Sequence, residues 1–154
     1  MDTWWIAKPY LLGGSNPTVT ELEALRLEGF QVLVSFLKED EQAPRYGVAR
    51  VEAVGFVRHN IPVKDFHPPT VNQMEQFIRL VDKLPAGVKA VVHCEGGTGR
   101  TGTFAAAYWI AKGMAAGDAI AHVRKARPGA VDTPGQQAAL EQFARVRMSG
   151  RGHR

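Results

Sequence analysis

The chain has 154 residues, which is enough for one domain with a sizeable core and too few for two domains of ordinary size. Its balance of 45% hydrophobic and 22% charged residues excludes a disordered chain, and no apolar run is long enough to cross a membrane. The net charge of +4 gives a mildly basic surface, and the single cysteine excludes an intramolecular disulfide and favours a reducing, cytoplasmic compartment.

The N-terminal half alternates short apolar runs with helical segments. Residues 4–12 predict one or two short strands that end at a Gly-Gly-Ser turn. Thr18 or Thr20 is placed to cap a helix that extends to Leu27, and Gly29 marks the end of that helix. Apolar runs at 31–37 and 56–62 predict buried strands, with a loop and a short helix at 48–54 between them.

The C-terminal half is mostly helical. Thr70 and Gln73 form a capping box that opens an amphipathic helix to about Leu84. Residues 89–94 predict the central strand, and helices are expected at 101–113, 117–126 and 133–147. Strands that alternate with helices indicate an α/β fold, with one domain built on a central, mostly parallel, twisted sheet flanked by helices. We place this domain at residues 1–148.

The remaining residues, 149–154, are expected to form a basic, frayed C-terminal tail. Arginines in and before this tail could attract anionic partners, but a solvated end without a partner is the favoured interpretation; they are Arg145, Arg147, Arg151 and Arg154.

A glycine-rich segment, His-Cys-Glu-Gly-Gly-Thr-Gly-Arg-Thr-Gly at residues 93–102, connects the central strand to a helix. Its glycines let the backbone curl so that several N–H groups converge at the positive end of the helix dipole. Such a site binds an anion the size of phosphate, sulfate or vanadate and stabilises a thiolate. The residues predicted to contact the anion are Glu95, Gly96, Gly97, Thr98, Gly99 and Arg100.

Cys94 and Arg100 carry the predicted chemistry of this loop. A thiolate at Cys94 can attack phosphorus and form a phosphocysteine intermediate, and the planar guanidinium of Arg100 can hold two phosphoryl oxygens at once. Thr101 places a hydroxyl within reach of the departing sulfur, and His93 is expected to fix the shape of the loop by bonding to nearby backbone. A buried, inert thiol is the alternative for Cys94, and the surrounding glycines and arginine disfavour it.

Phosphoryl transfer from a thiolate also requires a proton donor for the leaving oxygen. Asp65 is the candidate, because it follows a predicted strand in a loop with Phe66 and the stiff Pro68-Pro69 pair. A carboxyl shielded by Phe66 would hold its proton and then act as a base toward water. An ordinary turn carboxylate is the alternative for Asp65, and His67 is a second possible acid.

Three other classes of site are disfavoured. Residues 97–102 also match the dinucleotide pattern G-x-G-x-x-G, but too few residues follow for the rest of a dinucleotide-binding sheet. The Walker pattern requires a lysine where Arg100 stands. The five histidines have no spacing that would build a ligand set, so neither a metal nor another cofactor is predicted.

The segment His93-Cys94-x-x-Gly97-x-x-Arg100-Thr101-Gly102 resembles the signature of the cysteine-dependent protein tyrosine phosphatases, in particular their small, atypical dual-specificity branch. The segments at 61–69, 115–121 and 127–129 resemble the acid loop and downstream helices of the same branch. The resemblance implies metal-independent hydrolysis of phosphomonoesters, with Cys94 as nucleophile, Arg100 as phosphate clamp and Asp65 as general acid.

The resemblance also implies roles for two glutamines and for the residue after the nucleophile. Gln136 and Gln137 are similar in position to glutamines that orient the hydrolytic water in some relatives. Glu95 stands where a neutral or basic residue is common, and the loop lacks the lysines of relatives that act on phosphoinositides. A carboxylate at this position is expected to disfavour very highly charged substrates.

Three functions therefore compete. The leading hypothesis is hydrolysis of phosphotyrosine, with weaker phosphoserine or phosphothreonine activity, in phosphorylated proteins or peptides. The second is a 5′-phosphatase or triphosphatase acting on RNA, although no basic patch interleaved with aromatic residues supports a nucleic-acid partner, and none supports a membrane partner. The third is a catalytically silent phosphopeptide-binding module, which the presence of Cys94, Arg100 and Asp65 together disfavours.

Overall fold

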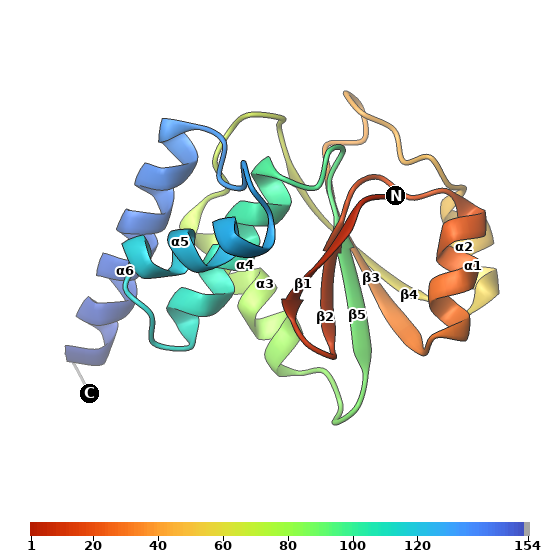
Figure 1. The fold of residues 1–154 in the computed structure, drawn as a ribbon, viewed down its shortest axis with the longest axis horizontal. Helices are drawn as coiled ribbons and strands as arrows, with labels where there is room; N and C mark the ends of the chain where they lie inside the picture. The colour runs from red at the N-terminus through yellow and green to blue at the C-terminus, as the bar shows by residue number, and fades with distance from the viewer. Residues whose placement is uncertain (153–154) are drawn as a thin grey trace.

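A computed structural model describes residues 1–152 and shows a five-stranded sheet between two layers of helices (Figure 1). The strands are β1 (Thr3–Ala7), β2 (Leu11–Gly14), β3 (Phe30–Leu37), β4 (Val57–Val63) and β5 (Lys89–His93). They lie in the order β1-β2-β5-β3-β4, and every adjacent pair is parallel except β1 with β2. The predicted α/β fold is confirmed, with β5 as its central strand.

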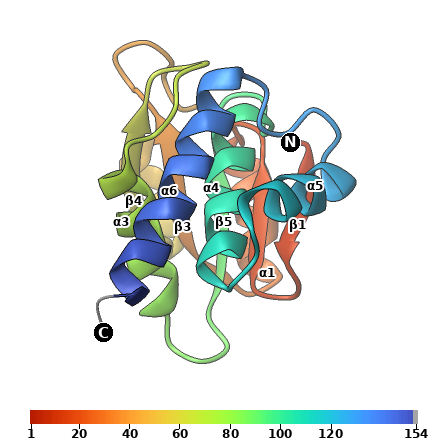
Figure 2. The same cartoon turned by 90° about the vertical axis from the view of Figure 1, so that its left-hand side faces the viewer.

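The six helices cover the two faces of the sheet unequally (Figures 1 and 2). One face carries α1 (Val19–Leu27) and α2 (Val48–Val54), and the other carries α3 (Val71–Asp82), α4 (Gly99–Ala111), α5 (Ala116–Ala126) and α6 (Pro134–Gly152). All the predicted helices are present within a few residues of their expected bounds. The α4 helix starts two residues earlier than predicted, because Gly99 and Arg100 already belong to its first turn.

Side-chain caps fix where two of the helices begin. Thr18, and not Thr20, caps α1 and forms a capping box with Glu21. Thr70 and Gln73 form the capping box predicted for α3. These reciprocal bonds satisfy backbone N–H groups that have no partner within the helix. They therefore fix the first residues of α1 and α3.

The core consists of two apolar clusters, one on each face of the sheet. The larger cluster lies between the sheet and α3–α6, and at its centre Phe104 stacks on Phe36 with ring centroids 3.9 Å apart and meets Phe77 edge to face. The smaller cluster lies beneath α1 and α2 and includes Leu22 and Phe30. Residues of β5 enter both clusters, so its carboxyl end is held from both sides.

One of the C-terminal arginines, Arg147, is anchored to the domain. Arg147 pairs with Glu75 of α3 at 2.9 Å and lies over the ring of Phe143. Residues 149–152 of the expected tail continue α6, and residues 153 and 154 lie outside the described residues. Among the described helices, none is both long and apolar enough to cross a lipid bilayer.

The aromatic contact at Phe104 should contribute strongly to stability. Replacement of this fully buried ring in Phe104→Ala should lower the free energy of unfolding by about 3–5 kcal/mol, because a cavity remains where the ring was. Urea unfolding measures this loss. The matched control Leu27→Ala removes a side chain that is 91% exposed and should change stability by less than about 0.5 kcal/mol. Equal losses for the two variants would contradict this account of the core.

Candidate active site

The glycine-rich loop lies between β5 and α4, at the carboxyl end of the central strand, as predicted (Figure 1). Cys94 follows β5 directly, is 2% exposed, and its Sγ accepts a hydrogen bond from the Gly97 N–H at 3.3 Å. Thr98 occupies the N-cap of α4 without a side-chain capping bond. The first N–H groups of α4 are therefore free of a side-chain cap, which leaves them available to an anion.

Close packing against the β1–β2 pair holds the loop in place. Gly97 has a φ of +78°, and a Cβ there would lie 2.7 Å from backbone atoms of Gly14 and Ser15. The carbonyl of Gly97 accepts a hydrogen bond from the Trp4 indole at 2.8 Å. Glycine is required here, because it adopts the positive φ without strain and has no Cβ to clash with the backbone of Gly14 and Ser15. The position of the phosphate loop therefore depends on the first strand as well as on β5.

Arg100 has a fully buried guanidinium that contacts residues at the end of β4 and in the loops after β3 and β4. Its Nη1 donates to the carbonyl of Val63 at 2.9 Å, and its Nη2 donates to Oε1 of Gln42 and lies 3.3 Å from Oδ1 of Asp65. Gln42 in turn donates through Nε2 to Oδ2 of Asp65 at 2.9 Å. The structure thus brings the predicted clamp and the predicted acid together and adds Gln42 as a bridge between them.

The surroundings of Asp65 differ from expectation in one respect. Its side chain is 37% exposed, and Phe66 is 66% exposed with a φ of +63°. The predicted shielding of the carboxyl by Phe66 is therefore not found, because the ring extends into solvent. The carboxylate is instead oriented by Arg100, Gln42 and the N–H of Phe66.

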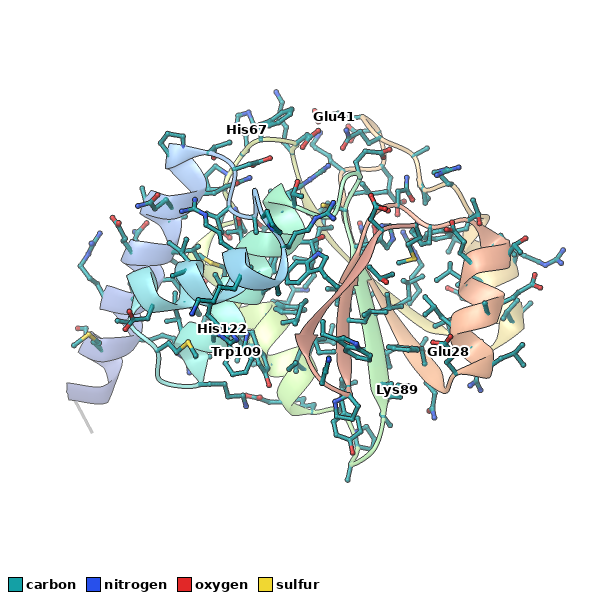
Figure 3. The ribbon with its side chains drawn as sticks, viewed as in Figure 1. Glu28, Glu41, His67, Lys89, Trp109 and His122 are labelled. Atoms are coloured by element: carbon teal, nitrogen blue, oxygen red, sulfur yellow. The ribbon has the colours of Figure 1, made fainter. Side chains whose placement is uncertain are left out.

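The alternative acid, His67, is exposed on the same loop (Figure 3). No hydrogen bond connects its ring to the described part of the site, whereas Asp65 contacts Arg100 directly. Among the described residues, no group of three or more His, Cys, Asp or Glu side chains could hold a metal ion.

His93 is buried behind the loop and belongs to a polar chain that runs away from it. Its Nδ1 lies 3.1 Å from the Cys94 carbonyl, which matches the predicted bond to nearby backbone, and its Nε2 lies 2.7 Å from the Tyr46 hydroxyl. Tyr46 also accepts a hydrogen bond from Arg58 at 3.1 Å. Burial, and more weakly the charges of Arg58 and Arg100, lowers the pKa of His93 to about 4, so the ring is neutral at pH 7.

The remaining predicted loop residues have different surroundings. Glu95 is directed toward Asn16, whose Nδ2 donates to it at 3.1 Å, and the Asn16 N–H donates to the Glu95 carbonyl. The hydroxyl of Thr101 is buried and has no hydrogen-bond partner among the described residues, so it remains available to a sulfur or phosphoryl oxygen.

The two glutamines after the Arg-Pro-Gly segment occupy different environments. Gln136 is fully buried, and its Oε1 accepts hydrogen bonds from the N–H groups of Asp132 and Thr133. Its Nε2 has no partner among the described residues, which leaves one donor for a ligand or water. Gln137 is exposed beside a cavity between α5 and α6. Of the two, Gln136 therefore better fits the predicted supporting position.

Sequence reasoning missed Gln42 and Asp132. Gln42 lies in the loop after β3, at the carboxyl edge of the sheet. Because ligands bind at this edge in parallel sheets, its position could have indicated a place in the site. The Asp132 carboxylate lies so close to Gly99 that a Cβ there would be 2.5 Å from Oδ1, which explains the glycine at that position. No spacing in the sequence indicates this contact.

Comparisons with known proteins agree with this geometry. A family profile described as "Polymorphic toxin system, DSP-PTPase phosphatase" matches residues 10–114, which include Asp65, Cys94 and Arg100. The tyrosine-protein phosphatase cdc-14 of Caenorhabditis elegans is 35% identical over 102 residues, which cover 65% of this chain and 14% of that protein. The chain thus spans a small part of this relative. The phosphatidylglycerophosphate phosphatase PTPMT2 of Arabidopsis thaliana is 28% identical over 148 residues, covering 93% of this chain and 64% of that protein.

Solved structures show the same architecture. Tk-PTP in its active form superposes with a TM-score of 0.84 at 28% identity, covering 93% of this chain and 96% of that one. PTPMT1 in complex with PI(5)P superposes with a TM-score of 0.85 over 98% of this chain and 99% of that one. Because its identity is 21%, the second similarity concerns the fold alone.

The contact between Gly97 and the β1–β2 pair generates a first prediction for the site. Gly97→Ala should weaken the binding of inorganic phosphate by roughly tenfold or more, since strain and a backbone clash cost about 1–3 kcal/mol. Calorimetric titration with phosphate measures the affinity. Gly96→Ala is the matched control, because a Cβ there meets only Thr98 Oγ1, at 3.8 Å. Wild-type affinity in Gly97→Ala would contradict the proposed packing of the loop.

The buried His93 predicts a pH dependence of stability. In the unfolded chain, His93 takes up a proton below its ordinary pKa of 6.5. In the folded chain, its pKa is lowered to about 4, so the ring stays neutral until the pH approaches that value. The unfolded state therefore binds more protons in this window, and the free energy of unfolding should fall by about 2–3 kcal/mol from pH 7 to pH 4.5.

Urea unfolding at several pH values measures this loss. It should be reduced in His93→Gln and retained in His67→Gln, which removes an exposed histidine. An identical pH profile for wild type and His93→Gln would show that His93 does not cause the loss.

Proposed function

The chain belongs to the DSP-PTPase phosphatases, within the small atypical dual-specificity branch of the cysteine-dependent protein tyrosine phosphatases, and we propose that it hydrolyses phosphotyrosine through a phosphocysteine intermediate. The observation that carries this proposal is the contact network of the loop. Arg100, which follows the Cys94 nucleophile on the same loop, contacts the carboxylate of Asp65 at 3.3 Å. This contact supports roles for Cys94 as nucleophile, Arg100 as clamp and Asp65 as acid around the N-terminus of α4.

In the first step, the Cys94 sulfur attacks the phosphorus while the bond from phosphorus to the leaving oxygen breaks. The loop N–H groups and the guanidinium of Arg100 stabilise the charge on the transferred phosphoryl group. Asp65 donates its proton to the leaving oxygen. A bound phosphate dianion competes with Asp65 for the guanidinium of Arg100.

In the second step, a water molecule attacks the phosphocysteine, and the Asp65 carboxylate takes its proton. The bond from sulfur to phosphorus breaks, and inorganic phosphate and the Cys94 thiolate are released. The unpartnered hydroxyl of Thr101 and the Gly97 N–H supply hydrogen bonds to the departing sulfur. Gln136, through its unpartnered Nε2, supplies a donor for orienting the attacking water.

Phosphotyrosine in proteins is the substrate class that the loop supports best. Arg100 is the one cationic side chain within residues 93–102, and it contacts the carboxylate of Asp65. Glu95 on the loop faces Asn16, the Asp132 carboxylate lies beside Gly99, and Arg127 donates to the Gly96 carbonyl from outside the loop. Several carboxylates near the phosphate-binding loop of residues 93–102, the cradle, disfavour substrates that carry further phosphates, because like charges repel. A phosphomonoester on a protein side chain presents one phosphate only.

A phospholipid is the second candidate substrate. It is favoured by the similarity to the phosphatidylglycerophosphate phosphatase PTPMT2, which covers 93% of this chain. The same catalytic loop would serve it, and only the surface around the cradle would differ. Direct comparison of substrates therefore separates the two candidates.

The catalytic prediction is tested with para-nitrophenyl phosphate in EDTA from pH 5 to 8. Cys94→Ser should abolish hydrolysis, because the hydroxyl is a far weaker nucleophile than a thiolate. Asp65→Asn should lower kcat by about 100- to 10,000-fold, the usual contribution of a general acid. Glu52→Gln, which removes an exposed carboxylate on α2, is the control and should retain activity.

The substrate is tested by comparing kcat/KM for a phosphotyrosine peptide, a phosphoserine peptide, phosphatidylglycerophosphate and triphosphorylated RNA. We expect the phosphotyrosine peptide to give the highest value. A higher value for the lipid or the RNA would overturn the substrate but keep the mechanism. A folded, reduced wild type without activity on any of them would overturn the enzymatic proposal in favour of a phosphopeptide-binding module.

A further inference from the structure

A long groove lies beside β1, away from Cys94 and Asp65. It has a volume of about 730 Å³ and is bounded by α4 and α5 on its other side. Figure 2 shows α5 crossing next to β1, and Figure 3 shows Trp109 and His122 side by side near that strand. The residues that line it are Thr3, Trp4, Trp5, Ile6, Ala7, Lys8, Trp109, His122, Lys125 and Ala126.

The lining places this groove at the outer edge of the sheet. Successive residues of a strand point to opposite faces, and Trp4 packs into the cluster beneath α3–α6 while Trp5 stacks with Phe30 on the other face. A groove that touches six consecutive residues of this segment must therefore follow the strand edge. In the described part of the chain, β1 pairs with β2 alone. The other edge of β1 thus presents backbone N–H and C=O groups without a neighbouring strand.

The groove is also positively charged. Lys8 and Lys125 are exposed lining residues, and His122 also lines the groove. None of the lining residues is an aspartate or a glutamate. The ring of Trp109 packs edge to face against His122 at 4.8 Å, which holds the imidazole at the wall of the groove. Acidic side chains and backbone carbonyls complement these groups. A second copy of this chain does not, because its own β1 edge would bring the same cations against them.

We propose that the outer edge of β1 binds an extended, acidic segment of a protein partner by strand addition. Backbone hydrogen bonds to β1 supply affinity, and Lys8 and Lys125 select acidic side chains on the incoming strand. The irregularity between Trp5 and Ala7 and the shortness of β1 limit the match to a few residues, which disfavours indiscriminate pairing. This binding needs no catalytic turnover, so it stands independently of the proposed phosphatase activity.

Tryptophan fluorescence tests the proposal directly, because all three tryptophans of the chain line this groove. The probe is an acetylated and amidated heptapeptide that alternates Glu and Val. We expect a saturable change in fluorescence with a Kd in the micromolar range, which weakens as salt is added. The corresponding Lys-Val peptide should not bind. A Glu-Val peptide in which every second backbone amide nitrogen is methylated should lose binding, because those nitrogens cannot donate hydrogen bonds to β1.

Charge reversal supplies the matched variants. Lys125→Glu should weaken binding of the Glu-Val peptide by about five- to tenfold, because it places a carboxylate in the groove. Lys83→Glu makes the same change at an exposed position outside the groove and should leave the affinity unchanged. Hydrogen exchange should show that amides of β1 become protected when the peptide is bound.

Four outcomes would overturn the proposal. They are a lack of any saturable response to the Glu-Val peptide, an equal response to the Lys-Val peptide, an affinity unchanged by Lys125→Glu, and binding without protection of β1. A response to phosphatidylserine vesicles in place of the peptide would identify the groove as a membrane-contacting surface instead. Hydrolysis of para-nitrophenyl phosphate, measured on the same protein, tests the catalytic proposal separately.

Discussion

The buried guanidinium of Arg100 is the interaction on which the arrangement of the site depends. A charge this far from water is tolerated only when most of its donors are matched, and here a carbonyl, an amide and a carboxylate contact Nη1 and Nη2. Nε has no partner among the described residues, so it is a donor left for a bound anion. These three partners belong to the ends of β3 and β4, whereas Arg100 belongs to α4. One side chain therefore ties two loops to the helix that presents the phosphate cradle. Asp65 is thereby held beside the loop that contains Cys94.

A second polar network stabilises the other side of the same loop. His93, at the end of β5, connects the Cys94 carbonyl to Tyr46, and Tyr46 connects to Arg58 on β4. Because the imidazole stays neutral at pH 7, it can serve as both donor and acceptor without adding a charge beneath the cradle. Together with the Trp4 indole on the Gly97 carbonyl, this network orients the loop backbone from beneath. The N–H groups are thus preorganised before an anion binds.

The sequence predicted those parts of the site that lie on one segment or at strand ends. Cys94 and Arg100 share a loop of distinctive spacing, and Asp65 follows a strand of the same parallel sheet, whose carboxyl ends converge. Gln42, Asp132 and the contact between Tyr46 and His93 could not be predicted in this way. Each depends on how a loop or helix from another part of the chain packs against the cradle, and neither periodicity nor capping signals encode that packing. The outward position of Phe66 was missed for the same reason, since its positive φ depends on the loop as a whole.

The distribution of charge bears on the proposed preference for singly phosphorylated substrates. The chain has a net charge of +4, yet the neighbours of the loop include the carboxylates of Asp65, Glu95 and Asp132. In the proposed function, directed N–H groups and one guanidinium bind the anion, and such donors recognise the shape of a single phosphoryl group. The cations at the β1 edge lie outside the cradle and do not add to that recognition. If the proposed protein substrates are correct, selection among them is expected to depend on surfaces such as this edge, because the loop contacts only the phosphate that all of them share.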